Sequence, residues 1–554
     1  MTSAGRTGHA RNGAAARKRG YQNSMRFSKI MAFTMAGAAF TALAQPARPQ
    51  AADTLSISVA ADRNGPTINR HIFGQFAEHL GSGIYGGIWV GKESRIPNVR
   101  GIRSDVVAAL KAIQVPNVRW PGGCFADEYH WRDGIGPAAK RAVRVNTNWG
   151  GAAEPNTFGT DEFMDFVQQV GTEAYVSVNM GSGTIEEAAD WVAYMTADAS
   201  STAGKERAAN GHAKPYKVKF LGLGNESWGC GGSMRPDHYV DLMKRFARFT
   251  HNFNPAQQEG DDVMQRIAVG PNDNDGSYTE AVMKAWKDHD WAWDIQGLSL
   301  HSYTTDGWPP HLPSTGFDET DYAKLIRATL KIDGIIAEHS AIMDRYDPEK
   351  KVALVIDEWG AWLAPLPGTD PGFLVQQNSL RDGILAALNI NIFARHADRV
   401  RMTNIAQMIN VLQAMILTDK EKMVLTPTYH VYKMYVPFQD ATFVPVSFDA
   451  GSFVQGDISL PRVDAIAARA KDGKLWLAMV NVDPRRPANV RVRFDGVTVK
   501  AAQGEVLTAP SVASINEFTA PDVVAPRPLA GRVDAGGVTF ELPSKSVVVV
   551  QIDS

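Results

Sequence analysis

Two glutamates stand directly after apolar runs in this sequence. Glu226 ends the run FLGLGNE and precedes Ser-Trp, and Glu358 ends the run ALVIDE and precedes Trp-Gly. A carboxylate at the end of a buried strand carries a large desolvation cost unless it is paired or has a use. Two such groups at one pocket suit general acid/base catalysis and nucleophilic attack on a glycosidic bond. The alternative is that each forms a structural ion pair with a neighbouring arginine.

Other polar side chains follow apolar runs in the same way. They are Glu78, Arg119, Asn179, Asn225, His301, Tyr303 and Gln407. Tryptophans also lie in or just after such runs, namely Trp89, Trp120, Trp131, Trp149, Trp228, Trp308, Trp359 and Trp362. Indole faces pack against the apolar faces of sugar rings while polar groups bind the hydroxyls, so this combination favours a sugar substrate. Any single tryptophan is nevertheless more often a core residue than a ligand contact.

The apolar runs themselves recur between residues 70 and 430 as strands separated by helical segments. The predicted strands span residues 71–79, 115–123, 174–181, 218–226, 266–273, 295–303, 352–360 and 403–411. One intervening helix begins at Pro236 and has one apolar face, made of Tyr239, Leu242, Met243, Phe246 and Phe249. Eight strand–helix units predict an α/β fold, a (β/α)8 TIM barrel whose chemistry lies at the carboxyl ends of its strands. A doubly wound open sheet is the alternative, but it would be expected to carry a GxGxxG phosphate loop, and the glycine-rich stretches here do not fit one.

After residue 430 the pattern changes to short runs of period two. In VRVRF, residues 490–494, apolar residues alternate with arginines, and Asp495-Gly496 follows as a hairpin signal. Residues 431–554 are therefore predicted to form an antiparallel, jelly-roll-like β-sandwich. The stretch TLSISVA precedes the barrel, so residues 45–69 are expected to supply the sandwich with one or more strands.

Residues 1–44 do not have the pattern of a folded domain. Arg26 and Lys29 precede an apolar run that ends in the small-x-small motif Ala42-Leu43-Ala44. This pattern predicts a signal peptide with an N-terminal extension, and the true start could be Met25. We therefore expect a secreted or periplasmic protein with no membrane attachment after cleavage. An uncleaved anchor is the alternative, but the apolar run is short of the roughly 20 residues that a span needs.

Composition restricts partners and cofactors. The net charge of −2 provides no field that would attract nucleic acid. The histidines form no HExxH motif or other convincing ligand cluster, so neither a metal nor a cofactor is expected. The two cysteines, Cys124 and Cys230, could form one disulfide or stay as free thiols.

Several stretches together resemble glycoside hydrolase family 51, the α-L-arabinofuranosidases. They are FGQFAEHLGSGIYGGIW, RWPGGCFADEYHWRDGIGP, GLGNESWGCGGSM, LSLHSYT, IDEWG and NIAQMINV. The similarity runs from about His71 to Tyr435 and continues more weakly into the C-terminal region. The resemblance implies an enzyme that acts on arabinofuranosyl-containing plant polysaccharide or oligosaccharide, and it makes a homo-oligomer reasonable.

The resemblance also implies catalytic roles for the residues that match the family's motifs. Glu226 would be the general acid/base and Glu358 the nucleophile. Arg119 would support the charge of the nucleophile and Tyr303 would lie against it, while His301 would lie near the acid/base.

Further matching positions are implied to bind substrate. Glu78, Asn225 and Gln407 would hold the furanose hydroxyls, and Trp149 and Trp362 would border the leaving group. All of these residues belong to motifs quoted above or to the loops that follow the predicted strands.

This chain departs from the family's common pattern at the rim of the site. RWPGGCFADEY stands where members commonly read RYPGGNFVSGY, and residues 156–159 read NTFG where many carry NEFG. These differences put the aglycone preference in doubt and leave the chemistry intact. Cys124 and Cys230 match a pair at the mouth of the site, where Cys124 would border the substrate, and a disulfide and two free thiols both stay open.

We therefore predict a retaining, exo-acting α-L-arabinofuranosidase that releases terminal non-reducing residues from arabinan, arabinoxylan or derived oligosaccharides. Its two carboxyl groups should lie about 5 Å apart, whereas a separation near about 9 Å would indicate inversion. One alternative is a retaining glycosidase of the same fold with another glycone, such as a β-xylosidase or an endoglucanase. The others are a non-catalytic carbohydrate-binding protein and a metal-dependent hydrolase on the same barrel.

Overall fold

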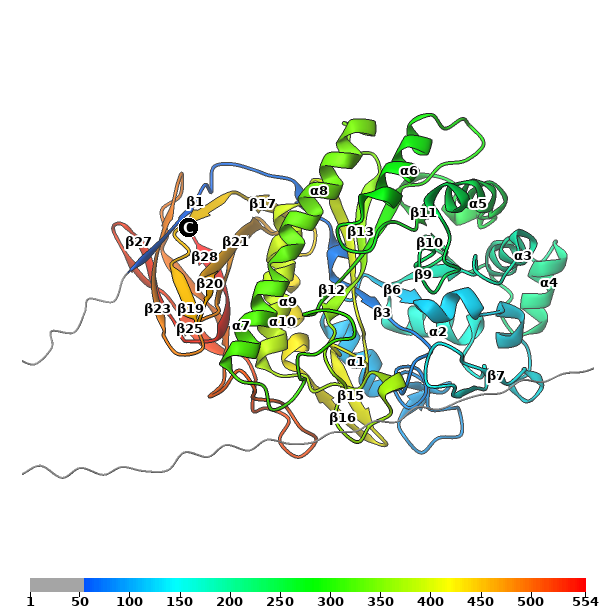
Figure 1. Ribbon diagram of the computed structural model, residues 1–554, viewed down its shortest axis with the longest axis horizontal. Helices are drawn as coiled ribbons and strands as arrows, with labels where there is room; N and C mark the ends of the chain where they lie inside the picture. The colour runs from blue at the N-terminus through cyan, green and yellow to red at the C-terminus, as the bar shows by residue number, and fades with distance from the viewer. Residues whose placement is uncertain (1–53) are drawn as a thin grey trace, which may run out of the picture. The chain divides into compact units, whose positions relative to one another are not determined.

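The computed structural model describes residues 54–554, in which eight parallel strands close into a barrel (Figure 1). The strands follow one another around the barrel in chain order, and the last, β14, pairs with the first, β3. They are β3 (Gly74–Phe76), β6 (Asn117–Trp120), β9 (Glu173–Val178), β10 (Phe220–Leu223), β11 (Gln265–Ala268), β12 (Gly297–Thr304), β13 (Ala353–Ala361) and β14 (Val400–Ile405). The predicted (β/α)8 barrel is confirmed, and each strand falls within or beside its predicted range.

Helices connect the strands and surround the barrel (Figure 1). Within the described residues the α-helices are α1 (Ser104–Ala112), α2 (Thr160–Val170), α3 (Ile185–Thr196), α4 (Thr202–Ala209), α5 (Pro236–Phe249), α6 (Gly276–Lys287), α7 (Glu319–Thr329), α8 (Lys331–Tyr346), α9 (Leu380–Arg395) and α10 (Pro427–Met434). In α5, proline occupies the first turn and Tyr239, Met243 and Phe246 are buried as predicted. Phe249 is 54% exposed, contrary to the prediction, because the helix ends at this residue.

The interior of the barrel changes character along its axis. Side chains from five of the strands fill the end where the strands begin, and they form one cluster of Tyr175, Phe220, Ile267, Ala353, Val355 and Met402. Charged and polar side chains fill the carboxyl end. The barrel is therefore a packed core at one end and a polar pocket at the other.

The C-terminal region forms two packed sheets. One contains β18 (Val446–Phe448), β1 (Leu55–Val59), β23 (Ala488–Phe494), β27 (Gly537–Leu542) and β26 (Arg532–Asp534) in that order. The other contains β2 (Thr67–Ile68), β17 (Ala441–Val444), β21 (Val463–Arg469), β22 (Leu475–Asn481), β28 (Ser546–Asp553), β24 (Ala501–Leu507) and β25 (Arg527–Ala530). Their facing apolar side chains make a second core, and the predicted sandwich is confirmed.

The strand from the start of the described chain lies inside the sandwich. In Figure 1 the blue β1 lies beside the orange β23, and residues 55–59 pair in parallel with residues 490–494. The sandwich is therefore not purely antiparallel, because β1 comes from before the barrel and no hairpin constrains its direction. Helix α10 packs against α9, and we propose that the domain boundary follows α10 rather than falling at residue 430 inside it.

The barrel and the sandwich share buried polar contacts. Asp464 on β21 accepts hydrogen bonds from Asn391 at 2.7 Å and from Arg395 at 2.9 Å, and both donors lie on α9. Within residues 54–554, no helix combines the length and the apolar character needed to cross a membrane.

Candidate active site

The two predicted catalytic glutamates lie at the carboxyl ends of two barrel strands, β10 and β13. Glu358 lies within β13, and Glu226 lies in the turn that follows β10. Glu226 has a φ of 38°, a left-handed conformation that is uncommon for a residue with a side chain. The backbone N–H groups of Gly229 and Gly231 donate to its carbonyl oxygen and hold this turn closed.

Glu358 receives hydrogen bonds on both carboxylate oxygens. Nη1 of Arg119 donates to Oε1 at 2.8 Å, and the hydroxyl of Tyr303 donates to Oε2 at 2.8 Å. Arg119 and Glu358 are both buried. Two donors, one of them a cation, stabilise the ionised carboxylate in this setting.

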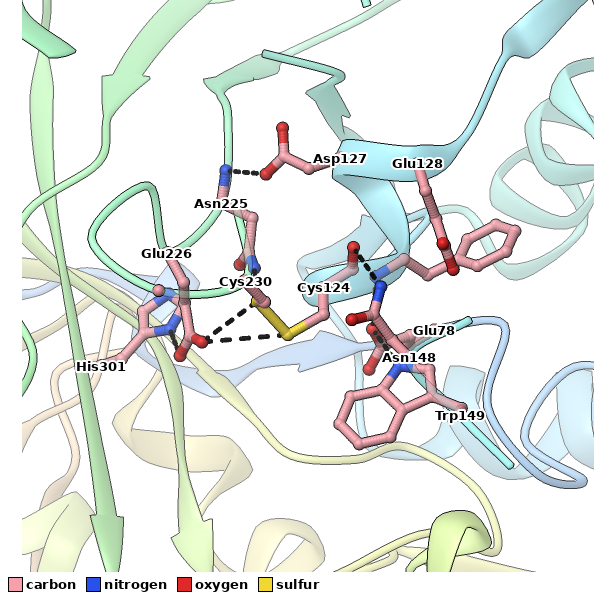
Figure 2. Close-up of a disulfide and its surroundings, with 12 residues drawn as sticks. Glu78, Cys124, Asp127, Glu128, Asn148, Trp149, Asn225, Glu226, Cys230 and His301 are labelled. Atoms are coloured by element: carbon pink, nitrogen blue, oxygen red, sulfur yellow. Dashed lines mark hydrogen bonds and ion pairs between the residues drawn. A yellow bond between two sulfur atoms is a disulfide. The ribbon is translucent and has the colours of Figure 1, made fainter. Parts of the chain in front are cut away.

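Glu226 has a different environment at each oxygen. Nδ1 of His301 lies 2.8 Å from Oε1, whereas Oε2 faces the two sulfurs of a disulfide (Figure 2). Burial raises the pKa of the Glu226 carboxyl; the hydrogen bond from His301 opposes this rise, and the negative charge of Glu358 adds to it. The two glutamates therefore differ: Glu358 is held by two donors, whereas burial and a neighbouring acid raise the pKa of Glu226.

The two carboxyl groups are close. An oxygen of Glu226, a nitrogen of His301 and an oxygen of Glu358 all lie within 4.8 Å of one another. Nδ1 of His301 is 3.3 Å from Oε2 of Glu358, so the imidazole lies between the two glutamates. This spacing matches the roughly 5 Å of retaining enzymes and leaves no room for the water that an inverting enzyme places between its carboxylates.

Asp357 is a charged residue of the site that sequence reasoning missed. Its carboxylate lies 3.4 Å from Nε of Arg119 and 3.2 Å from Nε2 of His301, and it accepts a hydrogen bond from Tyr175 at 2.7 Å. Neighbours in a regular strand point to opposite faces, so Asp357 and Glu358 should diverge. The pairing of β13 with β14 shifts register between Ile356 and Trp359, and this irregularity lets both carboxylates reach the barrel interior.

The ring of His301 is consequently held by acids on both nitrogens. Burial disfavours the charged imidazolium, but Glu358, Asp357 and Glu226 outweigh that cost and raise its pKa to about 10. Burial likewise acts to raise the pKa of Asp357, but Arg119 and His301 lower it below its usual range. The signal that could have revealed Asp357 was a second acid directly before Glu358 in an otherwise apolar run.

A third carboxylate, Glu78, lies at the end of β3. Nε1 of Trp149 and the N–H of Phe125 donate to its Oε1 at 2.9 and 3.1 Å, and Nε2 of Gln407 donates to its Oε2 at 2.9 Å. Burial and then the charge of Glu358 raise the pKa of Glu78 to about 7 despite these donors. A Cβ at Gly123 would lie 2.9 Å from Glu78, so only glycine permits this close approach.

Gln407 and Asn225 present polar atoms at the same end of the barrel. Oε1 of Gln407 is buried and has no hydrogen-bond partner among residues 54–554, so it is free to meet a hydroxyl of a substrate. Oδ1 of Asn225 accepts from Nη2 of Arg119 at 2.6 Å, and its amide nitrogen lies 3.7 Å from the sulfur of Cys230.

These side chains line a small pocket. Its walls include Glu78, Cys124, Trp149, Glu226, Tyr303, Glu358, Trp362 and Gln407. The predicted site residues that line the pocket come from strand ends and loops far apart in sequence, and Arg119, Asn225 and His301 lie directly behind its wall.

Only some of the strand-end tryptophans reach this pocket. Trp149 and Trp362 line it, and the ring of Trp362 meets Tyr303 edge-on at 4.8 Å and Trp308 at 4.9 Å. The buried members of the group belong to the core, namely Trp89, Trp120, Trp131 and Trp359. Trp308 is exposed at the rim.

Asp127 was not predicted from the sequence either, because it lies in a short 3-10 helix (Cys124–Glu128) rather than at a strand end. Its buried carboxylate accepts hydrogen bonds from the backbone N–H groups of Met180, Gly181 and Asn225 at 2.7, 2.8 and 2.9 Å. It therefore ties together the loops after β6, β9 and β10, and Figure 2 shows its bond to Asn225. No pattern in the sequence distinguishes this acid from an exposed loop residue.

Cys124 and Cys230 form a disulfide across 106 residues. Figure 2 shows it between Glu226 with His301 on one side and Glu78 with Trp149 on the other. The structure thus decides between the disulfide and the free thiols that the sequence left open, and it places Cys124 in the pocket wall.

The fold and this pocket together define the chain as a glycoside hydrolase. A TIM barrel has its active site at the carboxyl ends of its strands. A pair of close carboxyl groups in unlike environments is the catalytic arrangement that cleaves a glycosidic bond.

Comparison with known proteins identifies the family. Residues 357–546 match the α-L-arabinofuranosidase C-terminal domain, and residues 109–308 match the α-L-arabinofuranosidase 1 domain. The intracellular exo-α-L-arabinofuranosidase of Bacteroides ovatus is 45% identical over 500 residues, which cover 90% of this chain and 95% of that protein. The crystal structure of the GH51 arabinofuranosidase from Xanthomonas axonopodis pv. citri has a TM-score of 0.87 and 51% identity, covering 90% of this chain and 100% of that one.

A further solved structure agrees. The α-L-arabinofuranosidase of Thermotoga maritima in complex with arabinose has a TM-score of 0.76 and 30% identity, covering 90% of this chain and 100% of that one. The chain belongs to glycoside hydrolase family 51, the α-L-arabinofuranosidases, as its sequence motifs had indicated.

The comparison corrects the predicted location. The expectation of a secreted or periplasmic enzyme is wrong, because the Bacteroides ovatus relative, which covers 90% of this chain, is named intracellular. The expectation rested on the basic and apolar residues at positions 1–44. Those residues lie outside the part of the chain that the structure describes.

Proposed function

We propose that this enzyme releases terminal non-reducing α-L-arabinofuranosyl residues from arabinan, arabinoxylan or oligosaccharides derived from them, by double displacement. The observation that carries the proposal is the pair Glu226 and Glu358. A carboxylate oxygen of one lies within 4.8 Å of a carboxylate oxygen of the other, and the two groups differ in environment. The small pocket supports exo action, because Glu78, Trp149 and Trp362 wall it in around the two glutamates.

In the first step, the ionised carboxylate of Glu358 attacks the anomeric carbon. The bond from that carbon to the leaving oxygen breaks, and the proton of Glu226 passes to the leaving oxygen. Arg119 and Tyr303 hold both oxygens of Glu358 and so fix the direction of attack. The product of this step is a covalent arabinosyl-enzyme and a released alcohol.

In the second step, Glu226 is ionised and takes a proton from water. The water oxygen attacks the anomeric carbon from the face the leaving group vacated, and the carboxylate of Glu358 is released. Because each step inverts the anomeric carbon, the product retains the α configuration.

We assign the remaining pocket residues to the substrate. Glu78 and Gln407, which line the pocket, and Asn225, which lies directly behind its wall, would bind the furanose hydroxyls. Trp149 and Trp362 would border the leaving group. A substrate carrying a terminal arabinofuranosyl group would therefore be recognised mainly through that single residue.

The test is hydrolysis of 4-nitrophenyl α-L-arabinofuranoside by the wild type, Glu226→Ala and Glu358→Ala, with and without azide. Each variant should lose about 10²–10⁴-fold in the step that needs the missing group. Azide should restore turnover in both variants but with opposite stereochemistry. In Glu226→Ala it replaces water in the second step and gives the α-azide, and in Glu358→Ala it attacks the substrate directly and gives the β-azide.

A matched control is Glu541→Ala, which removes an exposed glutamate from the sandwich and should leave activity unchanged. Identical azide products from the two active-site variants would contradict the assignment of roles. Turnover of a nitrophenyl β-xyloside or of unbranched β-glucan, with none of the arabinofuranoside, would overturn the glycone.

A further inference from the structure

Oε2 of Glu226 faces a disulfide where a hydrogen-bond donor would be expected. The sulfur of Cys230 lies 3.4 Å from this oxygen and that of Cys124 lies 3.9 Å from it (Figure 2). A disulfide sulfur carries no hydrogen and can only accept. A hydrogen bond at these contacts therefore requires that the proton be on Glu226.

We propose that the Cys124–Cys230 disulfide accepts a hydrogen bond from the protonated carboxyl of Glu226 and thereby holds the general acid in its acid form. The inference rests on the proposed role of Glu226 in catalysis. The disulfide is a positioning and tuning element, because it acts through Glu226 on the transferred proton.

The other oxygen of Glu226 leaves no alternative place for that proton. Nδ1 of His301 lies 2.8 Å from Oε1, and Nε2 of the same ring lies 3.2 Å from Asp357. Acids on both sides keep both ring nitrogens protonated at neutral pH, so His301 donates and Oε1 accepts. The proton of Glu226 must then lie on Oε2, the oxygen beside the sulfurs.

The charged groups around Glu226 explain why a neutral acceptor matters. Arg119 on β6 and His301 on β12 are cations, and both favour the ionised form of Glu226. Glu358 on β13 opposes them, and the hydroxyl of Tyr303 on β12 faces the same group. The disulfide lies beside Oε2 and adds a hydrogen-bond acceptor without adding charge.

The bond is placed so that it also holds the turn that carries Glu226. Cys230 lies four residues after Glu226, and Cys124 follows β6 on another wall of the pocket. Glu226 has a left-handed φ of 38°, a conformation that persists only when its surroundings determine it. Cleavage of the disulfide would therefore change both the acceptor and the restraint.

Reduction of the disulfide should reverse the preference of Glu226 for its protonated form. A dithiol reductant would give two electrons and two protons to the S–S bond, form the two cysteine thiols and become a disulfide itself. A thiol at the position of Cys230 can donate to a carboxylate, which favours the ionised form of Glu226. Cys230 is exposed, so a soluble dithiol can reach the bond.

The experiment compares oxidised wild type, wild type reduced by dithiothreitol, and the double variant Cys124→Ala/Cys230→Ala. The pH dependence of kcat/KM is measured for each with 4-nitrophenyl α-L-arabinofuranoside and with an arabinofuranosyl oligosaccharide. The chain has only two cysteines, so titration of free thiols reports this bond alone. Treatment of the double variant with dithiothreitol is the matched control and should change nothing.

The alkaline limb of the profile should move to lower pH by about half to one unit in the reduced enzyme and in the double variant. The loss at high pH should be larger for the oligosaccharide, because a poor leaving group depends more on the acid. Reoxidation should restore the original limb. If the double variant fails to fold, the reversible reduction of the wild type still gives the result.

An alkaline limb that stays in place or moves to higher pH would overturn the proposal. An equal loss of kcat/KM at every pH would overturn it as well, since that is the effect of a purely structural bond. Glu226→Ala distinguishes a failure of the proposed function from a failure of the proposed role of the disulfide. If that variant shows no added dependence on the leaving group, the proposed function fails; if it does and the limb is unmoved, only the role of the disulfide fails.

Discussion

The guanidinium of Arg119 donates to Oε1 of Glu358 at 2.8 Å, and both side chains are buried. The same guanidinium donates to Asn225 and lies 3.4 Å from Asp357. One cation therefore contacts the candidate nucleophile, the amide of Asn225 proposed to bind substrate, and the acid Asp357. Since its planar head makes all three contacts at once, a lysine could not replace it.

Arg119→Lys should lower kcat/KM by about 10²–10³-fold, the cost of removing one preorganised donor from a charged reacting group. Steady-state kinetics on the nitrophenyl arabinofuranoside measure the effect. Arg144→Lys, at an arginine whose side chain is 58% exposed, is the control and should be neutral. Wild-type kcat/KM in Arg119→Lys would show that the contact is only structural.

Asp127→Asn should lower the free energy of unfolding by about 1–3 kcal/mol, because the new amide group would face backbone N–H donors that then lack a partner. The buried carboxylate accepts from three backbone groups, one of them Asn225, so kcat should fall as well. Denaturant unfolding and kinetics are the measurements. Asp190→Asn changes an exposed acid and serves as control. Unchanged stability would show that Asp127 does not hold the three loops.

Trp149→Phe keeps an aromatic ring but removes the N–H that donates to Glu78 at 2.9 Å. A lost hydrogen bond to a carboxylate should lower kcat/KM roughly tenfold, mainly through KM, because it weakens the hold on the sugar. Substrate titration with an arabinofuranosyl oligosaccharide measures this. Trp476→Phe, in β22 of the sandwich, should have no such effect. A fall confined to kcat would argue against a binding role.

The buried charge of His301 predicts a pH-dependent stability. Its pKa rises from 6.5 to about 10 on folding, so the imidazolium contributes fully below pH 6.5 and its contribution is lost as the pH rises toward 10. The melting temperature of His301→Gln should therefore lie furthest below that of the wild type in acid, and the gap should narrow above pH 6.5. A gap that widens with pH would contradict a charged His301.

Much of the fold could be predicted from short stretches of the sequence. The eight barrel strands and the helix that begins at Pro236 follow from hydrophobic period and helix-start signals, which depend on neighbouring residues. Glu226 and Glu358 stood out for the same reason, since each follows an apolar run. The prediction that Phe249 belongs to the buried face was wrong, because the point where a buried face ends depends on the length of the helix and on its neighbours.

Residues close together in the chain carry the order of strands and helices, the two strand-end glutamates and the family motifs, so each of these could be predicted. Three contacts are visible only in the folded chain: Cys124 bonds to Cys230, Asp357 turns inward beside Glu358, and Asp127 holds three loops. These contacts form between residues far apart in sequence, or through a local irregularity of strand pairing. Closure of the barrel sets both, and no local pattern records it.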